Sequence, residues 1–128
     1  MTGLHRIIGY VVLLGVLVAA MHARSLVRSG REYAPGPYVG AVVALDLQVL
    51  IGAVVYVSDR VWDVADTPLL TWVHPVLMVA ALAVGHVAVR RARSEQMAAD
   101  GFATVGRGLL ATFVLLVLGV AAASSGVT

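Results

Sequence analysis

Four apolar stretches, each long enough to cross a bilayer, constrain this chain more than any other feature of its sequence. A membrane-spanning helix needs about 20 predominantly apolar residues. The stretches cover residues 3–23, 38–57, 68–89 and 102–122. Because backbone polar groups in lipid must be satisfied within the segment, each stretch predicts an α-helix. The predicted fold is therefore all-α, an integral membrane four-helix up-down bundle that forms one domain over residues 1–128.

The composition agrees with lipid as the surrounding medium. The chain has 128 residues, of which 60% are hydrophobic and 12% charged, against roughly 45–50% and 25% in soluble domains. Such a short chain cannot bury so much apolar surface in one soluble core. The chain is thus predicted to be a multi-pass protein of the cell membrane, of the bacterial inner-membrane kind. We expect no nucleic-acid partner, because the arginines adjoin apolar spans. The absence of cysteine excludes disulfides and thiolate metal sites.

The arginines predict the orientation, because cytoplasmic loops are enriched in basic residues. Only Arg6 and Arg60 lie at one end of the predicted spans. Seven arginines lie at the other end: Arg24, Arg28, Arg31, Arg90, Arg91, Arg93 and Arg107. The seven-arginine end is predicted to be cytoplasmic, which places both termini outside the cytoplasm.

Other signals near the span ends fit this division. Trp62 and Trp72 are expected at the outer interface, and Tyr33 and Tyr38 at the inner one. Asp66 and Thr67, followed by Pro68, predict a helix start. The first span lacks the short basic start and clear cleavage site of a signal peptide, so we expect it to be retained as a helix.

All four histidines of the chain lie on the first and third spans, at His5, His22, His74 and His86. These two helices run in the same direction and face each other diagonally in an up-down bundle. His5 and His74 therefore lie at one outer level, where two neutral imidazoles could ligate a haem iron from opposite sides. A single histidine near an interface is often only an interfacial polar residue, but two at one level favour ligation. The sequence thus predicts one haem b on His5 and His74.

Neighbouring residues extend this predicted site. Gly9, four residues after His5, lies on the same helical face and would let a flat macrocycle approach the backbone. Arg6 could pair with a propionate. Pro75 has two interpretations: it is either a first-turn proline tolerated without a kink, or a bend at Thr71 that aims His74.

His22 and His86 admit a second haem nearer the cytoplasm. They lie roughly 25 Å and 18 Å below His5 and His74, depths that helix tilt could reconcile. Their faces are roughly 100° and 120° away from those of the outer histidines, so each helix would present a different face at each level. The second haem is therefore the weaker hypothesis.

Asp46 is predicted to be a buried carboxylate within the second span, and a carboxylate there must be paired, protonated or in a polar cavity. Its candidate partners are Arg107 and His86. If a second haem exists, Asp46 could orient a ligand imidazole and Arg107 could meet a propionate. The simpler interpretation is a structural hydrogen bond that fixes the second helix.

Three segments resemble haem A synthase. The first is residues 4–19, LHRIIGYVVLLGVLVA, which resembles the family's helix that begins with a His-Arg pair. The second is residues 47–57, LQVLIGAVVYV, which resembles the next helix of the family. The third is residues 69–87, LLTWVHPVLMVAALAVGHV, which resembles the helix that carries the partner histidine. The resemblance covers about three of the four helices. It implies that His5 and His74 are the axial ligands of one haem b.

The chain also departs from that family. Haem A synthase has eight helices in two halves, and this chain corresponds to one half. Thr2 stands where the family has its catalytic glutamate, and the cysteine pair of some members is absent. We therefore predict no catalytic residue, and electron transfer rather than haem oxygenation. Small di-haem b-type membrane cytochromes have a similar arrangement of four helices.

The leading hypothesis is thus a membrane b-type cytochrome that exchanges electrons with a quinone or a partner redox protein. Two alternatives stay open. One is a membrane subunit or chaperone without a cofactor, in which the histidines are interfacial. The other is a small proton-linked transporter that uses Asp46 and His86.

Overall fold

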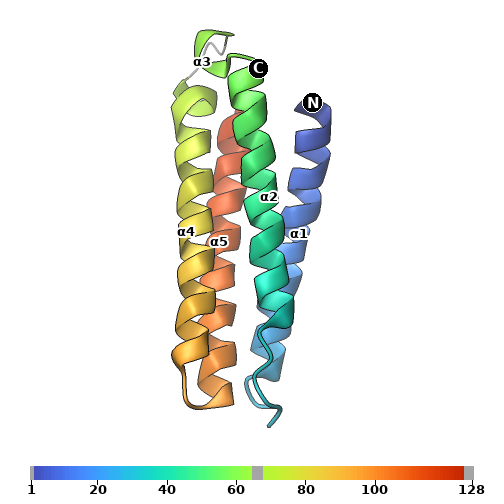
Figure 1. The fold of residues 1–128 in the computed structure, drawn as a ribbon, viewed down its shortest axis with the longest axis vertical. Helices are drawn as coiled ribbons and strands as arrows, with labels where there is room; N and C mark the ends of the chain where they lie inside the picture. The colour runs from blue at the N-terminus through green and yellow to red at the C-terminus, as the bar shows by residue number, and fades with distance from the viewer. Residues whose placement is uncertain (1, 65–67, 126–128) are drawn as a thin grey trace.

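A computed structural model of the chain describes residues 2–64 and 68–125 as a bundle of long helices (Figure 1). The four long helices are α1 (Thr2–Leu26), α2 (Gly36–Ser58), α4 (His74–Ser94) and α5 (Ala98–Ser125). The short helix α3 (Val61–Val64) and the π-helical turn η1 (Leu69–Val73) lie between α2 and α4. The predicted helix start at Asp66 and Thr67 lies outside the described residues.

Among residues 2–64 and 68–125, four helices are long and apolar enough to cross a membrane, as the sequence predicts. Each extends past its predicted bounds at the arginine-rich end: α1 to Leu26, α2 from Gly36, α4 to Ser94 and α5 from Ala98. The physical reason is that hydropathy marks only the turns that lie in hydrocarbon, whereas a helix continues wherever its backbone bonds are satisfied. Arginine supports these extra turns because its apolar stem can cover the helix while its head reaches water.

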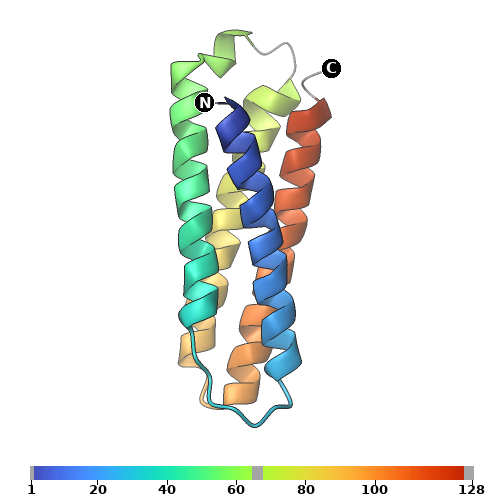
Figure 2. The ribbon, with the colours of Figure 1, turned by 90° about the vertical axis from the view of Figure 1, so that its right-hand side faces the viewer.

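The helices form an up-down bundle in which helices adjacent in sequence are antiparallel neighbours (Figures 1 and 2). Helix α1 packs against α2 and α5, and α4 packs against α2 and α5. Helices α1 and α4 are therefore diagonal across the bundle, as predicted. The outward side of α1 exposes Ile7, Val11, Leu14 and Val18, which is the surface that a lipid-facing helix requires.

The tightly buried core occupies the arginine-rich part of the bundle and stops short of the other end. Its first residue on α1 is Val12, and its first on α4 is Ala81. Position 12 lies seven residues after His5, and position 81 seven residues after His74, a distance of about 10 Å along each helix. On α1 and α4 both histidines therefore lie beyond this core cluster, whereas on α5 the cluster reaches Leu116, and Val55, Thr71 and Ala122 are also buried toward the histidine end.

The aromatic residues at the two ends of the bundle differ in exposure, which the sequence did not predict. Trp62 and Trp72 are 44% and 64% exposed at the end that carries α3, as an interfacial position requires. Tyr38, predicted to be interfacial, is instead fully buried. It stacks on Tyr33 with ring centroids 5.9 Å apart and meets the edge of Phe102 at 6.4 Å. The prediction for Tyr38 was wrong because its ring closes the core rather than anchoring the chain in headgroups.

A π-helical turn precedes His74. The His74 N–H bonds to the carbonyl of Leu69, five residues earlier. Pro75 has no N–H to offer the Thr71 carbonyl four residues before it. The Tyr56 hydroxyl of α2 donates to that carbonyl instead, at 3.0 Å. The proline therefore has a structural partner on α2, and the wider turn lies directly before the histidine.

Candidate cofactor site

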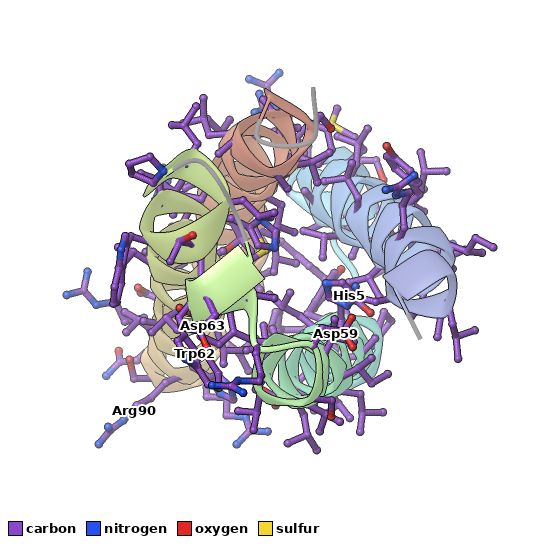
Figure 3. All side chains as sticks on the ribbon, turned by 90° about the horizontal axis from the view of Figure 1, so that it is seen from above. His5, Asp59, Trp62, Asp63 and Arg90 are labelled. Atoms are coloured by element: carbon purple, nitrogen blue, oxygen red, sulfur yellow. The ribbon has the colours of Figure 1, made fainter. Side chains whose placement is uncertain are left out.

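The side chains of His5 and His74 meet across the bundle. Their ring centroids are 6.5 Å apart, and the ring planes are inclined at 80° to each other. Seen down the bundle, His5 points from α1 inward toward α2 rather than out into the surroundings (Figure 3). The predicted juxtaposition of two histidines at one level on diagonal helices is therefore present in the structure.

The separation of the two ring centroids falls within the range for two imidazoles that share a metal ion, while the Cε1 and Nε2 edge of His5 lies against Gly52 of α2. A metal–imidazole bond is about 2.0–2.1 Å, so two imidazoles on opposite sides of one metal have centroids roughly 6–6.5 Å apart. The observed 6.5 Å lies at the upper end of that range. Each ring can turn about the axis through the metal without loss of the bond, so steeply inclined ring planes are compatible with such an arrangement.

A backbone carbonyl of α5 orients His74. The His74 Nδ1–H donates to the Gly119 carbonyl at 2.8 Å. This bond fixes the proton on Nδ1 and leaves the lone pair of Nε2 available. A metal-ligating histidine commonly donates its other ring N–H to a carbonyl or carboxylate in this way. His74 therefore already has the tautomer and the anchoring that a ligand needs.

Gln48 of α2 orients His5. Its Nε2 donates to the His5 carbonyl at 2.7 Å and lies 2.9 Å from His5 Nδ1. Its Oε1 is buried and without a hydrogen-bond partner, one of two such side-chain atoms in the described part of the chain, the other being the Tyr33 hydroxyl. A buried amide oxygen without a donor is costly, at about 1–3 kcal/mol.

Glycines make room around the two rings. A Cβ on Gly52 of α2 would lie 2.9 Å from His5 Cε1, so the His5 ring packs directly on the α2 backbone. Gly119 of α5 likewise makes room for the Met78 side chain, because a Cβ at position 119 would overlap the Met78 methyl group.

Gly9, predicted to face a macrocycle, instead faces the Gln48 amide, with Gln48 Nε2 at 2.9 Å from the position that a Gly9 Cβ would take. Arg6 lies exposed beside His5 on α1.

The second pair of histidines has a different arrangement. His22 Nδ1 is hydrogen-bonded to the Tyr38 hydroxyl at 3.1 Å. His86 Nε2 lies 2.8 Å from Asp46 Oδ1. Within residues 2–64 and 68–125, no ring contact joins His22 to His86. The second haem on this pair stays a prediction, and the pair has other partners in the structure.

Asp46 pairs with His86, one of its two predicted partners. It is not enclosed, however, because 38% of its side chain is exposed, as is 56% of His86. The prediction of a buried carboxylate was wrong, since the pair lies on the outer side of the seam between α2 and α4. Arg107 does not reach Asp46 and lines a groove between α4 and α5.

Sequence reasoning overlooked two parts of the site. Gln48 was given no role from the sequence, although its amide bonds to His5. A polar amide within an apolar span is itself a signal, because such residues usually make interhelical hydrogen bonds. The Gly119 carbonyl carries no such signal, because every residue has one.

Comparison with family models, curated proteins and solved structures finds no match to this chain.

Proposed function

We propose that this protein is a membrane b-type cytochrome that holds one haem b between His5 and His74 and transfers single electrons. The observation that carries the proposal is the 6.5 Å separation of the two imidazoles on diagonal helices. Electrons would be exchanged with a quinone or a partner redox protein. No residue is assigned a catalytic role.

The chemistry of the donor set favours a macrocycle over a bare metal ion. Among the described residues, no group of three or more His, Asp or Glu side chains could hold a metal ion. Two imidazoles alone leave a first-row metal under-coordinated, because even a tetrahedral site needs four ligands. A haem would need two ligands from the protein, which is the number of imidazoles that meet here. Held by both His5 and His74, it would supply one-electron transfer rather than oxygen chemistry.

The surroundings of the pair support the same conclusion. On α1 and α4 the core cluster ends about 10 Å from the two histidines. Gln48 bonds to His5, and Met78, one turn after His74, packs against Gly119. Methionine is unbranched and readily changes shape. Arg6, exposed at the same level, would pair with a propionate carboxylate.

If His5 ligates iron, the orientation of the Gln48 amide has to change. Binding iron through Nε2 requires the His5 proton on Nδ1. The Gln48 amide would then turn over so that Oε1 accepts from Nδ1–H, and the side chain would give up its present bond from Nε2 to the His5 carbonyl and move away from that carbonyl. Both axial histidines would thereby donate Nδ1–H to an oxygen, one to a side-chain amide and one to the Gly119 carbonyl.

The test is a reduced-minus-oxidised absorption spectrum of the purified protein, with haem counted per chain. We expect the narrow bands of a six-coordinate b haem at one haem per chain. His5→Ala and His74→Ala should each abolish these bands. His22→Ala is the matched control, because it removes an exposed histidine of the same helix as His5, and it should leave them unchanged. Bands that survive both outer variants would overturn the proposal.

A second candidate function rests on the Asp46–His86 pair. A carboxylate and an imidazole 2.8 Å apart at mid-span can share and pass a proton. This contact favours a small proton-linked transporter. Proton uptake by vesicles that contain the protein tests this alternative: a flux that Asp46→Asn abolishes and His5→Ala spares would favour transport over electron transfer.

A further inference from the structure

A groove between α4 and α5 at the arginine-rich end has the form of a lipid site. It has a volume of about 610 Å³, and its apolar lining includes Ala83, Val87 and Gly108. Along α4 it reaches from Ala83 to Glu95, twelve residues, or about 18 Å. One leaflet of the hydrocarbon core is about 15 Å thick. The groove thus matches the length of an acyl chain from headgroup to mid-membrane.

Two arginines line this groove, Arg91 near the end of α4 and Arg107 from α5. Among the described residues, neither Arg91 nor Arg107 forms an ion pair with a carboxylate. Arg107 lies nine residues into α5, at a depth where an unpaired charge is costly. An anion from outside the chain would relieve that cost.

The carboxylate in the groove has a different partner. Glu95 Oε1 accepts a hydrogen bond from the Thr104 hydroxyl at 3.3 Å. Two arginines against one glutamate leave the groove with a net positive charge. A zwitterionic headgroup gains little from such a site, whereas a phosphate without a compensating amine gains the full attraction.

We propose that this groove binds one anionic phospholipid, with its phosphate at Arg91 and Arg107 and an acyl chain along Ala83 and Val87. The site is separate from the histidine pair, so it does not depend on haem binding. Its occupant belongs to the leaflet that meets the arginine-rich end of the bundle.

Native mass spectrometry of the detergent-purified protein tests the proposal, with phosphatidylglycerol and phosphatidylcholine as probes. We expect one phosphatidylglycerol to be retained in preference to phosphatidylcholine. Arg91→Gln and Arg107→Gln should each weaken its binding about fivefold, given about 1 kcal/mol for each basic residue near the surface. Inorganic phosphate at millimolar concentration should not displace it, because phosphate lacks the acyl chain.

Arg90→Gln is the matched control, because Arg90 lies at the same level but projects away from the bundle (Figure 3). It should leave phosphatidylglycerol binding unchanged. Ala83→Phe keeps both arginines and fills the apolar part of the groove, so it should also weaken binding. Equal losses in Arg90→Gln and Arg91→Gln would mean diffuse attraction to basic loops and would overturn the proposal, as would displacement by phosphate or unchanged binding in Ala83→Phe.

Discussion

Two hydrogen bonds from the Gln48 amide hold His5 in place, which makes Gln48 the residue that most directly positions this half of the proposed site. Its proposed role is one of orientation, because it contacts the imidazole and would not itself bind the iron. Its substitution should therefore change the properties of the haem without removing a ligand.

Gln48→Glu should make the haem reduction potential more negative. A carboxylate accepts the His5 Nδ1–H more strongly than an amide does, which makes the ligand more basic and favours ferric iron. Gln48→Leu should weaken haem binding about 10–100-fold, as removal of such partners commonly does. Redox titration and haem titration measure the two effects. Asp46→Asn, two residues away on α2, is the control, and an equal shift of potential there would contradict the role of Gln48.

Tyr33 carries the other buried polar atom without a partner among the described residues. Burial raises the pKa of Tyr33 above its ordinary value near 10, and the Arg93 charge offsets part of that rise. In the unfolded chain Tyr33 would ionise near pH 10. Its contribution to stability is thus fully present below about pH 10 and is lost as the pH rises through the higher folded pKa.

Tyr33→Phe should therefore remove part of the alkaline loss of stability. At neutral pH the variant should be as stable as the parent or more stable, by up to about 1 kcal/mol, since no hydrogen bond is lost. Thermal unfolding in detergent between neutral pH and pH 11 measures both effects. Tyr10→Phe, at an exposed position of α1, serves as the control. A clear destabilisation of Tyr33→Phe at neutral pH would mean that the hydroxyl has a partner.

At the scale of the elements, some features follow from sequence and others do not. The four spans were predictable because hydropathy reports directly on lipid contact. The common level of His5 and His74 was predictable as well, since it needs only a count along antiparallel helices. The effect of Pro75 was not, because the sequence cannot say whether the Thr71 carbonyl finds another donor. The burial of Tyr38 could not be predicted either, because a tyrosine at the end of a span is equally suited to the membrane interface and to the protein core.

The bond between Tyr56 and the Thr71 carbonyl should be needed only because of Pro75. Tyr56→Phe leaves a buried carbonyl without a donor, at an expected cost of about 1–3 kcal/mol. Pro75→Ala restores an N–H at the position that normally serves this carbonyl, so the cost of Tyr56→Phe should fall in that background. A double-mutant cycle of thermal stabilities measures the coupling. Additive losses would show that the hydroxyl does not substitute for the missing backbone donor.

For the whole molecule, the fold separates two chemically different ends. The end with α3 carries the histidine pair and the exposed tryptophans, while the other carries the seven arginines and the close-packed core. A haem on the histidines would therefore lie near one membrane surface. The distribution of arginine predicts that this surface faces away from the cytoplasm.

The absence of natural cysteine allows a direct test of this orientation. Trp62→Cys places a thiol at the histidine end, and Gln96→Cys places one in the loop between α4 and α5. A membrane-impermeant thiol reagent should label Trp62→Cys in intact cells and Gln96→Cys only in inverted vesicles. The reverse pattern would contradict the predicted topology but would leave the geometry of the bundle untouched.

The measurement that tests the central claim most directly is low-temperature electron paramagnetic resonance of the oxidised protein. Two axial imidazoles make ferric haem low-spin, and ring planes inclined at 80° predict a strongly anisotropic signal with one large g value. His5→Ala or His74→Ala should remove that signal. A high-spin signal from the parent protein, or no haem signal at all, would contradict ligation by the two histidines.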